Sequence, residues 1–142
     1  MKICTHKGLV LAVLTRNEHC PPHLHTGTDK WDARFEFSFW HQSVRLWDVT
    51  PAKNQPSARL LEELRQTVKE PHNLRKAREL WWSAMQSVCL IHQCWDAAAQ
   101  EVVTVRHKRA GAVLIQAARF DIQDYKTVLQ LAGRSNSVEI AL

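Results

Sequence analysis

An apolar residue recurs every three or four positions from Leu74 to Trp95, and neither glycine nor proline interrupts the chain as far as Gln100. Because an α-helix turns once in 3.6 residues, this spacing places the apolar side chains in one continuous stripe. The pattern predicts one long helix with Asn73 as its N-cap. Such a stripe needs cover, so it predicts either a homodimer formed through the helix or a C-terminal third that folds back over it.

Alternation of aromatic and polar residues from Trp31 to Trp40 predicts a strand with one buried face. Residues 9–14 form an apolar run typical of a strand covered on both faces, residues 17–27 read as a loop, and residues 43–49 predict a third strand. Together they predict an antiparallel meander. The aromatic face is expected to pack on the helical stripe, with Phe35, Phe37 and Phe39 against Leu74, Ala77, Trp81 and Ala84.

The rest of the chain adds a shorter helix and several weaker elements. Pro56-Ser57 opens the helix, and Glu70-Pro71 ends it because proline disfavours helix at the preceding residue. In the C-terminal third, residues 102–105 and 138–142 predict strands, residues 112–117 fit a strand or a helix, and Asp121 can cap a helix that stops at Gly133. The fold class expected is α+β: a small antiparallel sheet, comprising the N-terminal meander and further C-terminal strands, packed against two to three helices, one of them long.

Size and composition favour one ordinary globular domain spanning residues 1–142. The chain has 142 residues, 45% of them hydrophobic, and a length near that of a typical domain. Four cysteines occur without a CxxC pair, which predicts reduced thiols, and no stretch is long and apolar enough to span a membrane. We therefore expect a cytoplasmic protein with no membrane association.

One loop concentrates the residues with chemical potential. His19, His23 and His25 fall within seven positions, and Pro21-Pro22 stiffens the chain between the first two. Three imidazoles suit one divalent transition metal, zinc or manganese, with a coordination position left open. Further residues that can complete or orient the set are Glu18, Cys20 and Asp32. The alternative is a loop whose histidines only hydrogen-bond the loop and cap the sheet.

A net charge of +5 and a pI near 9.3 are compatible with nucleic-acid binding. The candidate phosphate or nucleic-acid contacts are Arg16, Arg34, Arg106, Lys108 and Arg109. Trp40 and Trp47 fall off the apolar side of their predicted strands. An exposed tryptophan beside Arg34 would suit base stacking or a partner surface.

The segment Asn17-Glu18-His19-Cys20-Pro21-Pro22-His23-Leu24-His25 resembles the His-Pro-Pro-Pro-His-x-His loop of a bacterial domain-of-unknown-function family, with Cys20 in place of the first proline. The resemblance covers roughly residues 8–85 and leaves residues 101–142 as a C-terminal extension. It implies a compact α+β protein, encoded beside a small antitoxin-like or DNA-binding partner, whose loop residues His19, Pro21, Pro22, His23 and His25 carry the function.

Two functional hypotheses follow. In the first, the chain is a bacterial accessory protein of a toxin–antitoxin-like or mobile-element locus, and its histidine loop binds a metal. If this protein is an enzyme, metal-assisted hydrolysis of a phosphodiester fits best, with Arg16 or Arg34 binding phosphate. In the second, the chain is a non-catalytic module that self-associates through its long helix. The basic cluster near Arg106 would then contact nucleic acid or a protein partner.

Overall fold

The computed structural model describes residues 1–107 and 109–142. The chain forms two compact units, which are described separately below: residues 1–38 with 42–85, and residues 39–41 with 86–142. The first unit ends at Met85, where the family resemblance also ends. The description of residues 1–142 as a single domain stays a prediction.

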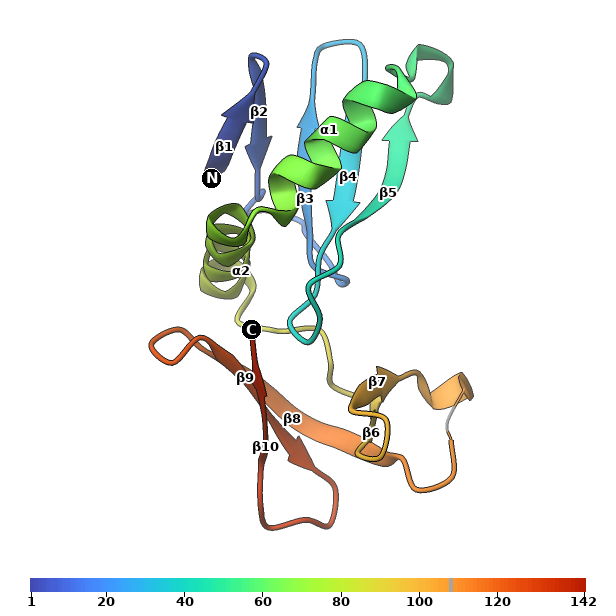
Figure 1. Ribbon diagram of the computed structural model, residues 1–142, viewed down its shortest axis with the longest axis vertical. Helices are drawn as coiled ribbons and strands as arrows, with labels where there is room; N and C mark the ends of the chain where they lie inside the picture. Colours follow the sequence, from blue (N-terminus) through green and yellow to red (C-terminus); the bar gives the residue numbers. More distant parts are fainter. Residues whose placement is uncertain (108) are drawn as a thin grey trace. The chain divides into compact units, whose positions relative to one another are not determined.

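The first unit is a five-stranded antiparallel sheet with two helices. Its strands follow one another in sequence order across the sheet: β1 (Lys2–His6), β2 (Leu9–Ala12), β3 (His23–Gly27), β4 (Asp32–Glu36) and β5 (Arg45–Thr50). A short 3₁₀ turn η1 (Ala52–Asn54) leads to α1 (Ala58–Lys69) and α2 (Pro71–Met85). Helix α1 crosses one face of the sheet over β3, β4 and β5 (Figure 1).

The sequence explains why the helices start and stop where they do. Ser57 caps α1 by accepting a hydrogen bond from the Leu60 amide, as the sequence predicts. Pro71 opens α2, because the first helical position needs no amide donor and proline is already in a helical φ range. Leu61, Leu64 and Val68 are the buried residues of α1. The apolar stripe of α1 therefore covers the sheet and closes the core of this unit.

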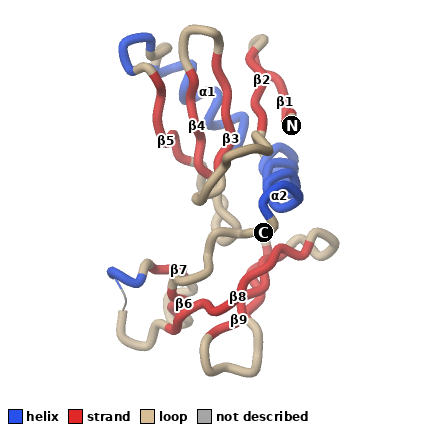
Figure 2. Tube along the Cα trace, turned by 180° about the vertical axis from the view of Figure 1, so that it is seen from behind, coloured by secondary structure: helices blue, strands red, loops and turns tan. Residues whose placement is uncertain are grey.

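Alternation along β3 and β4 separates a core face from an open face. Leu24, Ala33 and Phe35 are fully buried, whereas His25 and Arg34 are only partly buried. In the reverse view the sheet lies in front of α1, and the loop that precedes β3 runs across one end of the open face (Figure 2). That loop and that face carry the candidate site.

The second unit is another five-stranded antiparallel sheet, in the spatial order β10-β9-β8-β6-β7. Its elements are β6 (Cys94–Asp96), β7 (Glu101–Val103), the 3₁₀ turn η2 (Val105–His107), β8 (Val113–Asp121), β9 (Lys126–Leu131) and β10 (Val138–Ala141). Phe39 and Phe120 pack edge to face with ring centroids 5.3 Å apart, and Thr127 donates a 2.6 Å hydrogen bond to the Phe39 carbonyl. These contacts make residues 39–41 part of this unit's core.

The predicted fold class is wrong. The described residues form two five-stranded antiparallel sheets and only two α-helices, with 35% strand and 23% helix. A three-stranded meander against two or three helices is therefore not the architecture. Strands β1, β3 and β6 were not predicted. The strand predicted from residues 9–14 is not covered on both faces, because Val10 is 49% exposed while Leu11 is fully buried.

The long helix is the largest error. It ends at Met85, ten residues before the predicted stripe does. Gln86, Cys89 and His92 adopt φ angles of 50°, 63° and 71°, which no right-handed helix accommodates. Val88 and Trp95 are nevertheless buried, because β6 and the irregular chain before it supply core residues to the second unit. Ile91, which belongs to the same predicted stripe, is 44% exposed.

The helix predicted from Asp121 to Gly133 is also wrong, since these residues form the β8–β9 hairpin. Asp121 does accept a hydrogen bond from a nearby amide, that of Asp124, at 3.0 Å. The turn then closes through Tyr125 at φ 49°, and Thr127 to Leu129 continue as a strand. An Asp cap opens a tight turn as readily as a helix, so the cap alone does not identify the element.

The aromatic face was predicted correctly in part. Phe35, Phe37 and Phe39 are all buried, and Phe37 packs edge to face on Trp81 with centroids 6.3 Å apart. Strand β4 ends at Glu36, however, and Phe39 belongs to the second unit. Ala84, expected in the same seam, is exposed.

Two sequence predictions concern the surroundings of the protein. Neither α1 nor α2, the α-helices of the described residues, has the length and apolar character needed to cross a bilayer. Cys4 and Cys94 are free thiols, whereas Cys20 and Cys89 are each disulfide-bonded. The prediction of reduced thiols is therefore wrong for two of the four cysteines.

Candidate metal centre

Three side chains from the loop and from β3 converge on the open face of the first sheet. Glu18 comes from the loop before β3, while His23 and His25 are two residues apart on β3 and so share a face. One ligand atom from each lies within 4.8 Å of the other two. Glu18 and His23 are nearly buried, with side-chain exposures of 8% and 1%, although both are polar.

Each imidazole is oriented by a hydrogen bond at its Nδ1 atom. His23 Nδ1 lies 2.8 Å from the Pro21 carbonyl, and His25 Nδ1 lies 3.1 Å from an Asp32 carboxylate oxygen. Both partners only accept, so both Nδ1 atoms carry a hydrogen and donate it. This leaves both Nε2 atoms to face the site, the arrangement found in metal-binding histidines.

Both Nε2 atoms point at one carboxylate. His23 Nε2 contacts Glu18 Oε2, and His25 Nε2 lies 3.4 Å from Glu18 Oε1. Despite that proximity, His25 Nε2 is buried and makes no hydrogen bond within the described part of the chain. Since Nδ1 already holds the hydrogen of each neutral ring, a lone pair on each Nε2 faces oxygen lone pairs. A cation between them, either a proton or a metal ion, relieves the repulsion.

One separation in the cluster suits a bound zinc ion, whereas the closer contact between His23 and Glu18 would have to widen to admit one. Zinc bonds to nitrogen and oxygen ligands at about 2.0–2.2 Å, so tetrahedral ligand atoms stand about 3.3 Å apart. The separation between His25 Nε2 and Glu18 Oε1, 3.4 Å, agrees with this. A single proton can serve only one imidazole–carboxylate contact, whereas one metal ion satisfies both imidazoles and the carboxylate together.

Two tryptophans enclose His23. The Trp47 and Trp81 ring centroids lie 5.1 Å and 5.3 Å from that of the imidazole. Trp81 comes from α2 and is fully buried. Trp47 occupies an irregular position in the β4–β5 pairing, where the register shifts after Arg34. The sequence marked Trp47 as off the apolar face of its strand, but not as a wall of the histidine site.

The structure separates the loop residues that the sequence grouped together. His19 is exposed, its Nδ1 lies 3.1 Å from the Cys20 carbonyl, and its ring centroid is 5.8 Å from that of His23. It borders the cluster without supplying one of the three converging atoms. Cys20 is disulfide-bonded and offers no thiolate. Asp32 orients His25 and does not itself join the set.

The candidate phosphate contacts fall into different environments. Arg16 is exposed in the loop, and Arg34 lies on the open face beside the histidines. In the second unit Arg106 is exposed in η2, and Lys108 lies outside the described residues. Arg109 forms ion pairs with Glu101 at 2.9 Å and Asp96 at 3.1 Å. Its hydrogen bond to Glu101, followed by that to Asp96, raises the pKa of Arg109. The two ion pairs, and not the pKa, are what offset the charge of Arg109.

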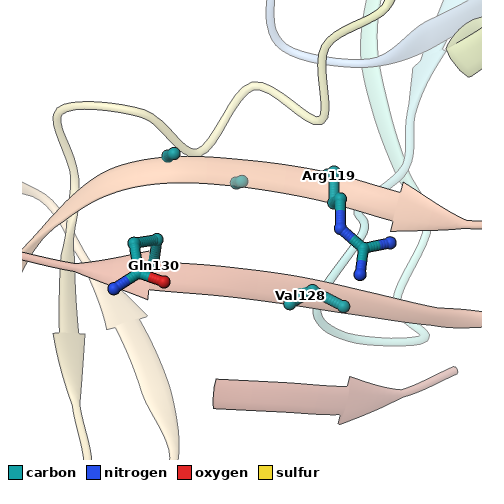
Figure 3. A pocket seen from close by; sticks show the side chains of 5 residues that line it. Arg119, Val128 and Gln130 are labelled. Atoms are coloured by element: carbon teal, nitrogen blue, oxygen red, sulfur yellow. The ribbon is translucent and has the colours of Figure 1, made fainter. Parts of the chain in front are cut away.

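A pocket of about 340 Å³ lies on the β8–β9 hairpin (Figure 3). Its lining comprises Ala117, Ala118, Arg119, Val128 and Gln130. One arginine among small, apolar and amide side chains offers no metal ligand and no nucleophile. Within residues 1–107 and 109–142, the group that could hold a metal ion is Glu18, His23 and His25.

Comparisons with other proteins give no independent assignment, because no family model, no curated protein and no solved structure matches the chain. The resemblance to a bacterial domain-of-unknown-function family stays a prediction.

Removing the Asp32 carboxylate is expected to weaken zinc binding by about 10-fold. Loss of an outer hydrogen-bond partner of a metal-binding histidine lowers metal affinity roughly 10–100-fold. The Asp32 side chain is 53% exposed, so we expect an effect at the low end of this range. Competition with a chelating dye would compare Asp32→Ala with Asp29→Ala, an exposed carboxylate nearby in sequence. Equal affinities for the two variants would show that Asp32 does not orient His25.

Proposed function

We propose that the chain binds one divalent transition metal ion, zinc in the first instance, through Glu18, His23 and His25. The observation that carries this proposal is the orientation of the two imidazoles. Both use Nδ1 for a fixed acceptor and aim Nε2 at the same nearly buried carboxylate. Two imidazoles and one carboxylate with an open position are a donor set of catalytic zinc sites.

A metal-assisted hydrolysis is the activity that this donor set supports best. A bound divalent ion supplies a Lewis acid that polarises a carbonyl or phosphoryl oxygen and activates water. The chain would hold the ion with the three ligands, fix His23 through the Pro21 carbonyl, and limit water access to His23 with Trp47 and Trp81. A phosphate ester is the proposed substrate, the wider class to which the phosphodiester expected from the sequence belongs.

Metal content tests the proposal directly. Elemental analysis of protein purified without an affinity tag is expected to give one zinc or manganese ion per chain, and His25→Ala protein is expected to give none. Stoichiometric iron would confirm the metal site but not the proposed hydrolysis, since the same donor set binds iron(II) in other kinds of enzyme. Protein that takes up no divalent metal from a stoichiometric supply would refute the proposal.

The remaining sequence expectations enter as proposals of lower rank. A bacterial toxin–antitoxin-like or mobile-element locus and a small antitoxin-like partner follow from the family resemblance. Self-association and contact with nucleic acid belong to the alternative, non-catalytic function. The helix expected to form the dimer ends at Met85, and Arg109 is engaged in ion pairs. Self-association and nucleic-acid contact stay predictions.

A cytoplasmic location is the sequence-based proposal, and thiol counting tests it. Disulfides persist in oxidising compartments and are rare in the cytoplasm. From the structure we expect two free thiols in protein denatured without reductant, Cys4 and Cys94, and four after reduction. Four free thiols in protein trapped directly from cells would instead support the cytoplasm and would contradict the disulfide-bonded state of Cys20.

A further inference from the structure

Arg34 lies beside the proposed metal site on the same face of the sheet. It is the direct cross-strand partner of His25, and residues paired in this way project to one side. Asp48 is in turn the partner of Arg34 on β5. Since His25 is a proposed ligand, the guanidinium stands next to the coordination sphere without belonging to it.

The ion pair between Arg34 and Asp48 uses only one edge of the guanidinium. Arg34 Nε donates to Asp48 Oδ1 at 2.8 Å, and Nη2 donates to Asp48 Oδ2 at 2.5 Å. This side-on geometry leaves the end-on fork, Nη1 together with the second hydrogen of Nη2, still able to donate. Within the described residues, Nη1 makes no hydrogen bond. The fork is the part of arginine that binds two oxygens of an oxyanion at once.

Trp47 holds the guanidinium and connects it to the site. Arg34 Cζ lies 4.0 Å from the centroid of the Trp47 ring, a cation–π contact. The same indole meets the His23 ring edge to face, with centroids 5.1 Å apart. A side chain fixed by Asp48 at its edge and by Trp47 at its face loses little freedom when it binds a ligand.

The charges of the two clusters act on each other. The hydrogen bond that Arg34 donates to Asp48 is the largest influence that raises the pKa of Arg34, and Asp48, Asp32 and Glu18 raise it further by their charges. The pKa of Asp48 is lowered mainly by its hydrogen bond from Arg34. The guanidinium is thus a permanent donor within electrostatic reach of the site. Because Asp48 balances the charge of Arg34, a ligand would be selected by the geometry of the N–H hydrogen bonds and not by net charge.

We propose that Arg34 forms an oxyanion subsite next to the metal and that the group it binds is the phosphate of a phosphate monoester. This inference rests on the proposed metal site and narrows its substrate class. The fork takes two oxygens, and the metal takes a third. A carboxylate and a phosphodiester each have only two unesterified oxygens, whereas a phosphate monoester has three and can bind the arginine and the metal together.

The test is binding of inorganic phosphate to the zinc-loaded protein, followed by calorimetry. Arg34→Gln is expected to weaken phosphate binding by about 10- to 100-fold, the range for hydrogen bonds to a charged group, with zinc stoichiometry unchanged. Arg45→Gln is the matched control, because Arg45 forms the neighbouring β4–β5 ion pair, with Glu36, through its own Nε and Nη2. This control is expected to bind phosphate within about 2-fold of wild type.

Arg34→Lys keeps the charge without the fork and guards against misfolding of the glutamine variant. It is expected to bind phosphate more weakly than wild type while retaining zinc. Wild-type phosphate affinity in both Arg34 variants, or no phosphate binding by zinc-loaded wild type, would overturn the subsite. Failure to bind zinc would instead refute the metal site, and repeating the titration without zinc would still show whether phosphate binding depends on Arg34.

Discussion

Replacing His25 by alanine is expected to abolish stoichiometric zinc binding. The affinity for zinc should fall by more than the roughly 10–100-fold caused by removal of an outer hydrogen-bond partner, because one of the three ligands disappears. His25 is the better position to change, since His23 is wedged between Trp47 and Trp81 and its loss would also disturb packing. Chelator competition and equilibrium dialysis provide the measurement.

His19→Ala is the matched control for this experiment. The sequence groups His19 with His23 and His25, but the structure places Glu18 in the third position. His19→Ala protein should therefore bind zinc with an affinity within about 3-fold of wild type, because His19 supplies none of the three converging atoms. Glu18→Gln protein should lose stoichiometric zinc. The reverse result, with His19 required and Glu18 dispensable, would show that the loop closes differently around the ion.

Phe37→Ala is expected to lower the free energy of unfolding by about 3–5 kcal/mol, through lost burial and the cavity left behind. Phe37 is 1% exposed and packs on Trp81, which joins the sheet side of this unit to α2. Urea denaturation followed by tryptophan fluorescence measures the change. Because the chain has two compact units, the transition should also be followed by circular dichroism to check that one step is observed.

Val10→Ala serves as the control for the stability experiment. Val10 belongs to the same sheet but is 49% exposed, so its truncation is expected to cost below about 0.5 kcal/mol. A loss below about 1 kcal/mol for Phe37→Ala would mean that this part of the core is not packed as described. Equal losses for the two variants would contradict the assignment of the buried face.

The sequence predicted well wherever a local rule and the tertiary environment agree. Ser57 caps α1 because the polar cap and the apolar stripe that follows it point to the same element. The alternation of Ala33, Arg34 and Phe35 likewise reports a real half-buried strand. In both segments the period of the pattern and the local chemistry lead to one structure.

The failures arise where one apolar spacing fits two structures. From Val88 to Trp95 the spacing suits a helix, but the second unit buries Val88 and Trp95 without one and leaves Ile91 44% exposed. Positive φ angles at Gln86, Cys89 and His92 break the helix, and none of these residues is glycine. Long-range strand pairing, which decides such cases, leaves no mark in a local pattern.

The candidate site was predicted in composition but not in arrangement. The two-residue spacing of His23 and His25 correctly predicted that both imidazoles share one face. Glu18 was named only as an additional residue, because no local rule shows that the loop folds its carboxylate back over β3. The role of Trp47 as a wall depends on a register shift between β4 and β5, which the sequence does not reveal.

Anomalous diffraction at the zinc edge, from crystals grown with one equivalent of zinc, tests the central claim most directly. The account predicts one strong peak bonded to His23 Nε2, His25 Nε2 and a Glu18 carboxylate oxygen, at distances of about 2.0–2.2 Å. A peak coordinated by His19 in place of Glu18, or crystals of zinc-equilibrated protein with no peak between the two imidazoles, would contradict it.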